Sequence, residues 1–304
     1  MSDNPGHAQR SIGLFDATGI GVGAIVGGGI LALAGTAFAA TGPSAVLAFL
    51  LNGLIALTTA LSFTELATAF PQSGGTYLFA KRIVSVGAAF NVGWVVWFAS
   101  IVAAALYALG FAAFALDGCM ALWPRQLAWL ESTATYAAVA LASTLFCSAF
   151  LVRTEGTGGS WINVLKVLVF GMLIVGGLWA WQRDRPEALA QLKPFLPHGA
   201  KGLFRAMGYT FIALQGFDLV AAAAGKIKRP QRNIPLAMLL SLGIALAVYL
   251  PLLLLICIAG VPAGMTLETL AKASPETMVT YAADVFVGPI GFWIVLLVGL
   301  LSMF

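Results

Sequence analysis

The chain has 304 residues, of which 60% are hydrophobic and only 9% are charged, and it carries a formal net charge of +4 at pH 7. Charged residues make up about 25% of an average soluble domain, so this composition excludes a soluble globular fold and predicts a polytopic membrane protein. The three cysteines, Cys119, Cys147 and Cys257, stand in separate segments without disulfide or CxxC spacing, and we interpret them as small apolar filling residues.

Apolar, sparsely charged runs of roughly 20 residues are long enough to cross a bilayer, and the chain contains about eight of them. The predicted spans are residues 12–40, 43–64, 86–116, 133–152, 161–181, 203–224, 234–260 and 285–304. The connections are short, so we expect a single transmembrane domain over residues 1–304. No signal peptide precedes the first span, and the apolar run at the end of the chain predicts further helices beyond Phe304.

Two connections carry additional information. Residues 71–75, Pro-Gln-Ser-Gly-Gly, form a turn sequence before an amphipathic segment at 77–82, which is typical either of a short interfacial helix or of an ordinary re-entry turn. The basic cluster Lys226, Lys228, Arg229 and Arg232 follows the sixth span. Because basic residues favour the cytoplasmic side, the cluster predicts a multi-pass cell-membrane protein with its N-terminus in the cytoplasm.

The first span contains the most unusual segment, residues 19–29, which reads Gly-Ile-Gly-Val-Gly-Ala-Ile-Val-Gly-Gly-Gly. Each glycine inside a helix costs about 1 kcal/mol relative to alanine. Glycines at 19, 23 and 27 would make a close-packing face, but that face does not account for three consecutive glycines at 27–29. The alternative is a helix broken inside the bilayer, whose free backbone groups hold a ligand.

The sixth span contains a second interruption, Gln215-Gly216-Phe217-Asp218. An acid at mid-membrane depth is expensive and usually functional. A pair of glycine-interrupted spans at corresponding positions of two repeats, here the first and the sixth, points to a transporter site between them.

Several runs in the chain resemble, in order and spacing, the amino acid-polyamine-organocation (APC) superfamily of transporters. They are residues 23–30 (Gly-Ala-Ile-Val-Gly-Gly-Gly-Ile), 42–43 (Gly-Pro), 65–67 (Glu-Leu-Ala), Pro71, 74–77 (Gly-Gly-Thr-Tyr), 216–218 (Gly-Phe-Asp) and 228–235 (Lys-Arg-Pro-Gln-Arg-Asn-Ile-Pro). The resemblance implies an all-α polytopic membrane protein with two inverted five-helix repeats, as in leucine-transporter-type folds, and with broken first and sixth helices. The first repeat would cover roughly residues 12–181, and the second would begin at roughly residues 203–304.

The resemblance also implies a substrate site at the two breaks. The amides of Gly27, Gly28 and Gly29 would meet a substrate carboxylate at the start of a half-helix. The carbonyls of Ala24, Ile25, Ile212, Ala213 and Gln215 would meet the substrate ammonium. Gln215 would stand where an apolar residue is expected in this family, so it would either bind a polar substrate group or satisfy the broken backbone. The wall opposite would come from Ser100 and Tyr107, which share one helix face, although ordinary helix packing is the better explanation for either residue alone.

Two charged residues are candidates for coupling. Lys166 lies inside the fifth span, where relatives that do not use sodium often place a lysine ammonium; it would carry a proton, or else extend back to the interface. Asp218 would take part in coupling or gating, or else cap the broken sixth helix. The family commonly carries acidic residues before the basic turn, and this chain has Ala223-Ala224-Gly225-Lys226 instead.

These features predict a secondary active transporter of an amino acid or related amine that works by alternating access and is proton-coupled or an exchanger. The alternative is a non-transporting receptor or a channel of the same fold. We expect no enzyme activity, because His7 and His198 lie outside the spans and no paired intramembrane carboxylates or nucleophile–base spacing occurs. We expect no cofactor, metal or nucleic-acid partner.

Overall fold

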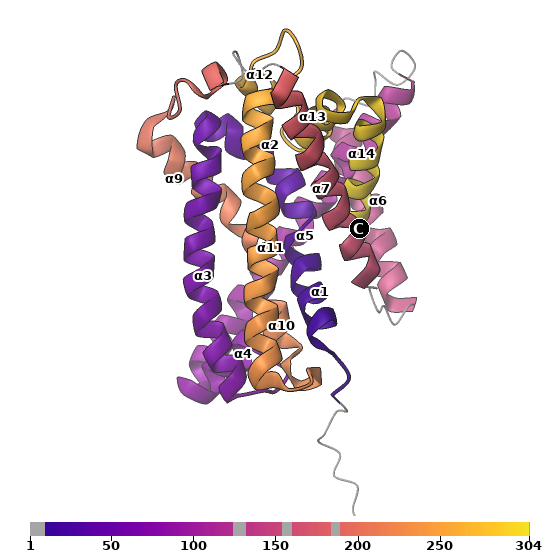
Figure 1. The fold of residues 1–304 in the computed structure, drawn as a ribbon. Helices are drawn as coiled ribbons and strands as arrows, with labels where there is room; N and C mark the ends of the chain where they lie inside the picture. Colours follow the sequence, from indigo (N-terminus) through magenta and orange to yellow (C-terminus); the bar gives the residue numbers. More distant parts are fainter. Residues whose placement is uncertain (1–9, 124–131, 154–159, 184–188, 304) are drawn as a thin grey trace, which may run out of the picture. The chain divides into compact units, whose positions relative to one another are not determined.

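The computed structural model describes residues 10–123, 132–153, 160–183 and 189–303, and every regular element in these residues is helical (Figure 1). The α-helices are α1 (Leu14–Ile25), α2 (Gly28–Thr41), α3 (Ala45–Ala69), α4 (Gly75–Ile83), α5 (Val86–Leu122), α6 (Thr133–Arg153), α7 (Ser160–Arg183), α9 (Gly199–Thr210), α10 (Asp218–Ala222), α11 (Pro230–Ala259), α12 (Leu267–Ala273), α13 (Met278–Val287) and α14 (Pro289–Met303). Short 3-10 turns are η1 (Gly42–Ser44), η3 (Leu189–Leu192), η4 (Phe211–Leu214) and η5 (Ala224–Lys226). The all-helical class predicted from composition is confirmed.

Five helical stretches of the described residues are long and apolar enough to cross a membrane. They are Leu14–Ala69, which combines α1, α2 and α3, and then Val86–Leu122, Thr133–Phe150, Trp161–Arg183 and Pro230–Ala259. The predicted sixth and eighth spans are absent from this set because each is divided into helices shorter than a span.

The prediction of one continuous helix over residues 285–304 is wrong. α13 ends at Val287, Gly288 has a φ of 85°, and α14 begins at Pro289. Proline lacks an amide hydrogen and is favoured at the first position of a helix, so the Gly-Pro pair ends one helix and starts the next. The predicted helix at 77–82 is confirmed as α4, while its position at the membrane interface stays a prediction. Phe304, beyond which further helices are predicted, lies outside the described residues.

The chain divides into two compact units. The first consists of Met1–Ile25, Gly53–Val102 and Leu214–Leu246, and the second of Val26–Asn52, Ala103–Ala213 and Ala247–Phe304. Two of the boundaries coincide with the interruptions of the first and sixth predicted spans, after Ile25 and after Ala213. The other boundaries lie inside the continuous helices α3, α5 and α11.

In the first unit α10 packs against α1 and α4. Phe63 makes edge-to-face contacts with Phe79 and Phe217, at ring-centroid distances of 6.0 and 6.1 Å. The segment before α1 is tied to the turn after α10, because the Ile12 amide donates to the Lys226 carbonyl at 3.0 Å and the Lys228 amide donates to the Ile12 carbonyl at 2.9 Å. These two bonds pair backbone groups of the segment before α1 with those of the turn that precedes α11.

In the second unit α2 is the central element and is nearly all buried. α9, α12, α13 and α14 pack against it. The side chain of Asn52 on α3 donates to the Met207 carbonyl at 2.9 Å and to the Thr210 hydroxyl at 3.0 Å, which ties α3 to α9. On α6, in contrast, Leu141, Leu145 and Phe146 are exposed. Exposed apolar side chains of this kind suit a helix that faces lipid.

Candidate functional site

The first helix is broken at Val26 and Gly27, between the end of α1 at Ile25 and the start of α2 at Gly28 (Figure 1). Gly27 has a φ of 138°, which residues with a Cβ atom rarely adopt. Gly27 is also the N-cap of α2 and has no side chain to satisfy the first amides of the helix. These amides have no intrahelical partner, and with the helix dipole they favour an anion.

The next two glycines allow close approach of neighbouring groups in the second unit. A Cβ atom added to Gly28 would lie 2.7 Å from Cε1 of Tyr107 on α5. A Cβ atom added to Gly29 would lie 2.8 Å from the Cα atom of Ala213, in the broken part of the sixth span. Distances this short exclude any larger residue unless the neighbours move, so the start of α2 and the end of η4 touch through backbone.

Tyr249 on α11, which the sequence analysis did not select, connects these two backbone segments. Its side chain is fully buried, and its hydroxyl donates to the Ala213 carbonyl at 3.4 Å. Backbone groups of Gly27 and Ile30 also hydrogen-bond to this hydroxyl. The phenol of Tyr249 therefore hydrogen-bonds both to the start of α2 and to a carbonyl of the sixth span. The available signal was a lone tyrosine in an otherwise apolar run, which is too weak to separate it from a packing residue.

A buried lysine lies beside the same break. Lys166 on α7 is only 8% exposed, and its Nζ atom is 3.5 Å from the position that a Cβ atom on Gly27 would take. The Ser302 hydroxyl on α14 is 2.9 Å from that position and finds no hydrogen-bond partner within the described residues. A buried cation and a buried hydroxyl, from helices distant in sequence, thus line the first break.

The sixth span is broken between η4, which ends at Leu214, and α10, which begins at Asp218. Gly216 has a φ of 137°, and its amide donates to Oδ1 of Asp218 at 3.1 Å. In the first unit Gly216 lies against the end of α1, since a Cβ atom on it would be 2.7 Å from Cβ of Ala24 and 3.0 Å from Cγ1 of Ile25. The Asp218 carboxylate therefore caps its own turn.

The predicted site residues thus fall into two groups. In the second unit the group lies at the start of α2 and on η4; it consists of Gly27, Gly28, Gly29, Lys166, Ile212 and Ala213. In the first unit the group lies around Gly216; it consists of Ala24, Ile25, Gln215 and Asp218.

Of the two residues predicted to line a wall, Tyr107 contacts the start of α2, whereas the exposed Ser100 hydroxyl donates to the Val96 carbonyl of its own helix at 2.8 Å. That bond leaves Ser100 with the ordinary helical role that the sequence analysis kept open.

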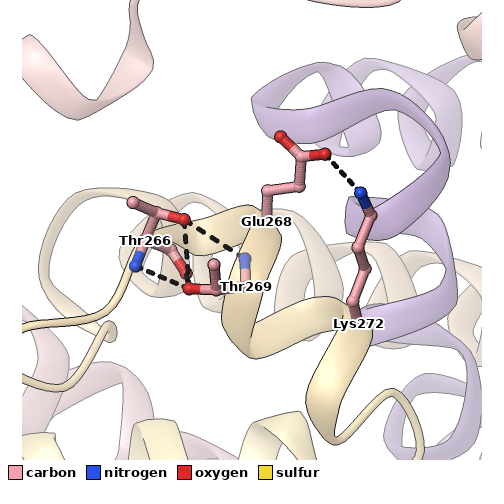
Figure 2. Close-up of polar contacts among 4 residues, drawn as sticks. All are labelled: Thr266, Glu268, Thr269 and Lys272. Atoms are coloured by element: carbon pink, nitrogen blue, oxygen red, sulfur yellow. Dashed lines mark hydrogen bonds and ion pairs between the residues drawn. The ribbon is translucent and has the colours of Figure 1, made fainter.

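Helix α12 provides a reference for a start that is capped by side chains. Its N-cap Thr266 and residue Thr269 form a capping box, in which the Thr269 amide donates to the Thr266 hydroxyl at 3.2 Å and the Thr266 amide donates to the Thr269 hydroxyl at 2.8 Å (Figure 2). One turn later Lys272 pairs with Glu268 at 2.6 Å. The side chains of α12 therefore bind the amides at its own N-terminus. The glycines at the start of α2 have no side chains that could do so.

The family model described as amino acid permease matches residues 16–304, a range that includes both broken helices. The chain belongs to the amino acid permease family. Among its relatives are the inner membrane transport protein YbaT of Escherichia coli, 28% identical over 99% of this chain and 67% of its own length, and the branched-chain amino acid permease BcaP of Bacillus subtilis, 30% identical over 79% of this chain and 53% of its own length.

A third relative of this chain is the chloroplastic cationic amino acid transporter 9 of Arabidopsis thaliana, which is 29% identical over 79% of the chain and 44% of its own length. The chain thus spans between 44% and 67% of the length of these curated relatives. The family match confirms the resemblance that the glycine and proline motifs indicated.

Proposed function

We propose that this permease is a secondary active transporter of an amino acid or related amine, which it moves by alternating access. The proposal is supported by the family and by relatives that are named as amino acid transporters. Because the chain is shorter than those relatives, the activity is proposed for the protein to which this chain belongs. The observation that carries the proposal is the start of α2, where glycines leave a helix N-terminus without a side-chain cap inside an apolar unit.

The substrate carboxylate binds at Gly27, Gly28 and Gly29 in this proposal. Two features support that assignment: the helix dipole is positive at this end, and Lys166 adds a positive charge beside Gly27. The hydroxyl of Tyr249 already hydrogen-bonds to backbone groups there. Since a hydroxyl both donates and accepts, it can turn its proton toward an arriving carboxylate.

The substrate ammonium binds to carbonyl groups at the ends of the broken segments. The candidates are the carbonyls of Ala24, Ile25, Ile212, Ala213 and Gln215, and η4 supports this because a 3-10 turn that stops before Gly216 leaves its last carbonyls without helical partners. Gln215 is half-buried and offers an amide to a polar substrate group.

Coupling to protons is assigned to Lys166, and Asp218 is kept as a second candidate. Lys166 is buried in a span, and within the described residues no ion pair compensates its charge. A cation without a counterion at this depth favours losing its proton when the substrate carboxylate leaves, which would link proton release to substrate release.

The proposal is tested by replacing Gly28 or Gly29 with valine in the full-length protein. A ligand screen by thermal shift, with the standard amino acids, putrescine and spermidine at two pH values, first identifies a stabilising compound. Uptake of that labelled compound into proteoliposomes is then expected in the wild type and absent in both variants. Gly208→Val is the matched control, because Gly208 lies on α9 with no atom within 4 Å of an added Cβ. Normal uptake by the Gly28 and Gly29 variants contradicts the assignment of the site.

A further inference from the structure

A basic pocket lies in the first unit, apart from the helix breaks. It has a volume of about 510 Å³ and is lined by Arg10, Pro71, Arg229, Pro230, Gln231 and Arg232. These residues come from the segment before α1, the turn after α3 and the start of α11. We call it the arginine pocket.

Local hydrogen bonds hold the walls of the arginine pocket. The two bonds between Ile12 and the Lys226–Lys228 segment fix the backbone two residues from Arg10. The side-chain amide of Asn233 donates to the Lys228 carbonyl at 2.6 Å, which ties the start of α11 to the preceding turn. Arg229 has a φ of 47°, a left-handed conformation that few residues other than glycine adopt. Arg229 and Arg232 therefore lie on a turn held by local hydrogen bonds, and Arg10 lies two residues before Ile12, whose backbone is bonded to that turn.

The pocket has the charge of an anion site. Three guanidinium groups line it, and α11 adds the positive end of a 30-residue helix that begins at Pro230. Within the described residues none of these arginines forms an ion pair with an acid. Glu65 lines a neighbouring pocket that shares Gln231. A guanidinium group binds two oxygens of either a carboxylate or a phosphate, but a phosphate group offers more oxygens and more charge to the three guanidinium groups of this pocket.

The position of the pocket along the chain selects the kind of phosphate. α3 ends at Ala69 and α11 begins at Pro230, and both helices belong to stretches long enough to cross a membrane. A pocket at the ends of two spans lies at the level of the lipid head groups. We propose that the arginine pocket binds the head-group phosphate of an anionic phospholipid. Clusters of arginine and lysine beside a span have this affinity through their charge.

The test compares two double variants of the full-length protein that remove the same charge. Arg10→Gln with Arg232→Gln empties the pocket of two guanidinium groups and leaves the backbone of Arg229 unchanged. Lys81→Gln with Arg82→Gln removes two charges from the last turn of α4, outside the pocket. Binding of short-chain phosphatidylglycerol, with short-chain phosphatidylcholine and inorganic phosphate as comparison probes, is measured in detergent by native mass spectrometry and titration.

We expect the pocket variant to bind phosphatidylglycerol about thirtyfold more weakly, because each basic residue near the surface contributes about fivefold. The α4 variant should retain affinity within about a factor of two, because Lys81 and Arg82 lie outside the pocket and salt screens their attraction to a bound phosphate. Both variants should melt like the wild type in neutral lipid. Equal losses in the two variants would show general charge attraction and overturn the proposal. It is also overturned if inorganic phosphate binds the pocket as tightly as the lipid, or if phosphatidylcholine binds as tightly as phosphatidylglycerol.

Discussion

The two broken helices have almost the same backbone at their breaks but different chemistry around it. Gly27 and Gly216 have φ angles of 138° and 137°. The Gly216 amide donates to Asp218, two residues away on its own segment, so this turn supplies the acceptor for its own amide. Among the described residues, the start of α2 is contacted by side chains of other helices, namely Tyr249, Tyr107, Ser302 and Lys166. The sixth break thus includes a cap from its own segment, whereas the contacts of the first break depend on the packing of other helices.

The comparison is tested most strongly at Lys166. Lys166→Met keeps the length of the side chain and removes its charge beside Gly27. We expect the effect of a pH gradient on uptake to fall by about 5- to 150-fold, the usual size of a coupling between two sites. Uptake into proteoliposomes with and without an imposed gradient measures it. Lys201→Met on α9, an exposed lysine, is the control and should change nothing. A Lys166→Met protein that still responds to the gradient would leave the first break without a coupling role.

Tyr249→Phe tests whether the first break depends on its neighbours. The change removes the hydroxyl that bonds to Ala213 and to the start of α2, and it leaves buried backbone groups without that partner. The free energy of unfolding should fall by about 1–3 kcal/mol, measured by thermal melts of the full-length protein. Tyr209→Phe, which removes an exposed hydroxyl that accepts from Arg205, should have a much smaller effect. Equal effects of the two changes would show that the Tyr249 contacts add nothing.

Two substitutions of Asp218 separate capping from coupling at the sixth break. Asp218→Ala removes the acceptor for the Gly216 amide and should lower the free energy of unfolding by about 1 kcal/mol. Asp218→Asn keeps an acceptor and should restore stability to within a few tenths of a kcal/mol. Uptake by the Asn variant decides the second role, because a carboxylate needed for coupling cannot be replaced by an amide. Loss of gradient-driven uptake with normal stability would show that Asp218 has a coupling role in addition to its cap.

The smallest effect is expected at α12, the helix that caps itself. The hydrogen bond from Lys272, and then its charge, lower the pKa of Glu268 below its ordinary value. The folded state thus holds this carboxylate charged more strongly than the unfolded chain does. The pair's contribution to stability is therefore present above the unfolded pKa, about 4.3, and is lost as the pH falls through the lower folded value. Glu268→Gln should remove this part of the acid dependence in thermal melts without changing substrate binding at neutral pH. A change in binding would contradict the view that α12 has only a structural role.

Much of the fold was predictable because its signals are local. Apolar runs identified the spans, and the glycines at 27–29 and at 216 located both breaks, since glycine in mid-membrane conflicts with a continuous helix. The break before Pro289 was missed although Gly288-Pro289 is a local signal, because the surrounding apolar run was long enough to span by itself. Ser100 and Tyr107 share a helix face, but Tyr107 contacts the start of α2 whereas the Ser100 hydroxyl donates to its own helix. Spacing alone could not separate these two roles.

The sequence by itself determined the membrane class, the helical content, the family and the positions of the two breaks, because hydropathy and backbone freedom depend on neighbours along the chain. Only the tertiary structure decided which side chains serve each break. Tyr249 and Ser302 come from α11 and α14, far from Gly27 in sequence, and packing alone brings them to the start of α2. From the sequence, Asp218 could either cap the broken helix or take part in coupling. In the folded turn its carboxylate accepts from the Gly216 amide, which is the capping contact.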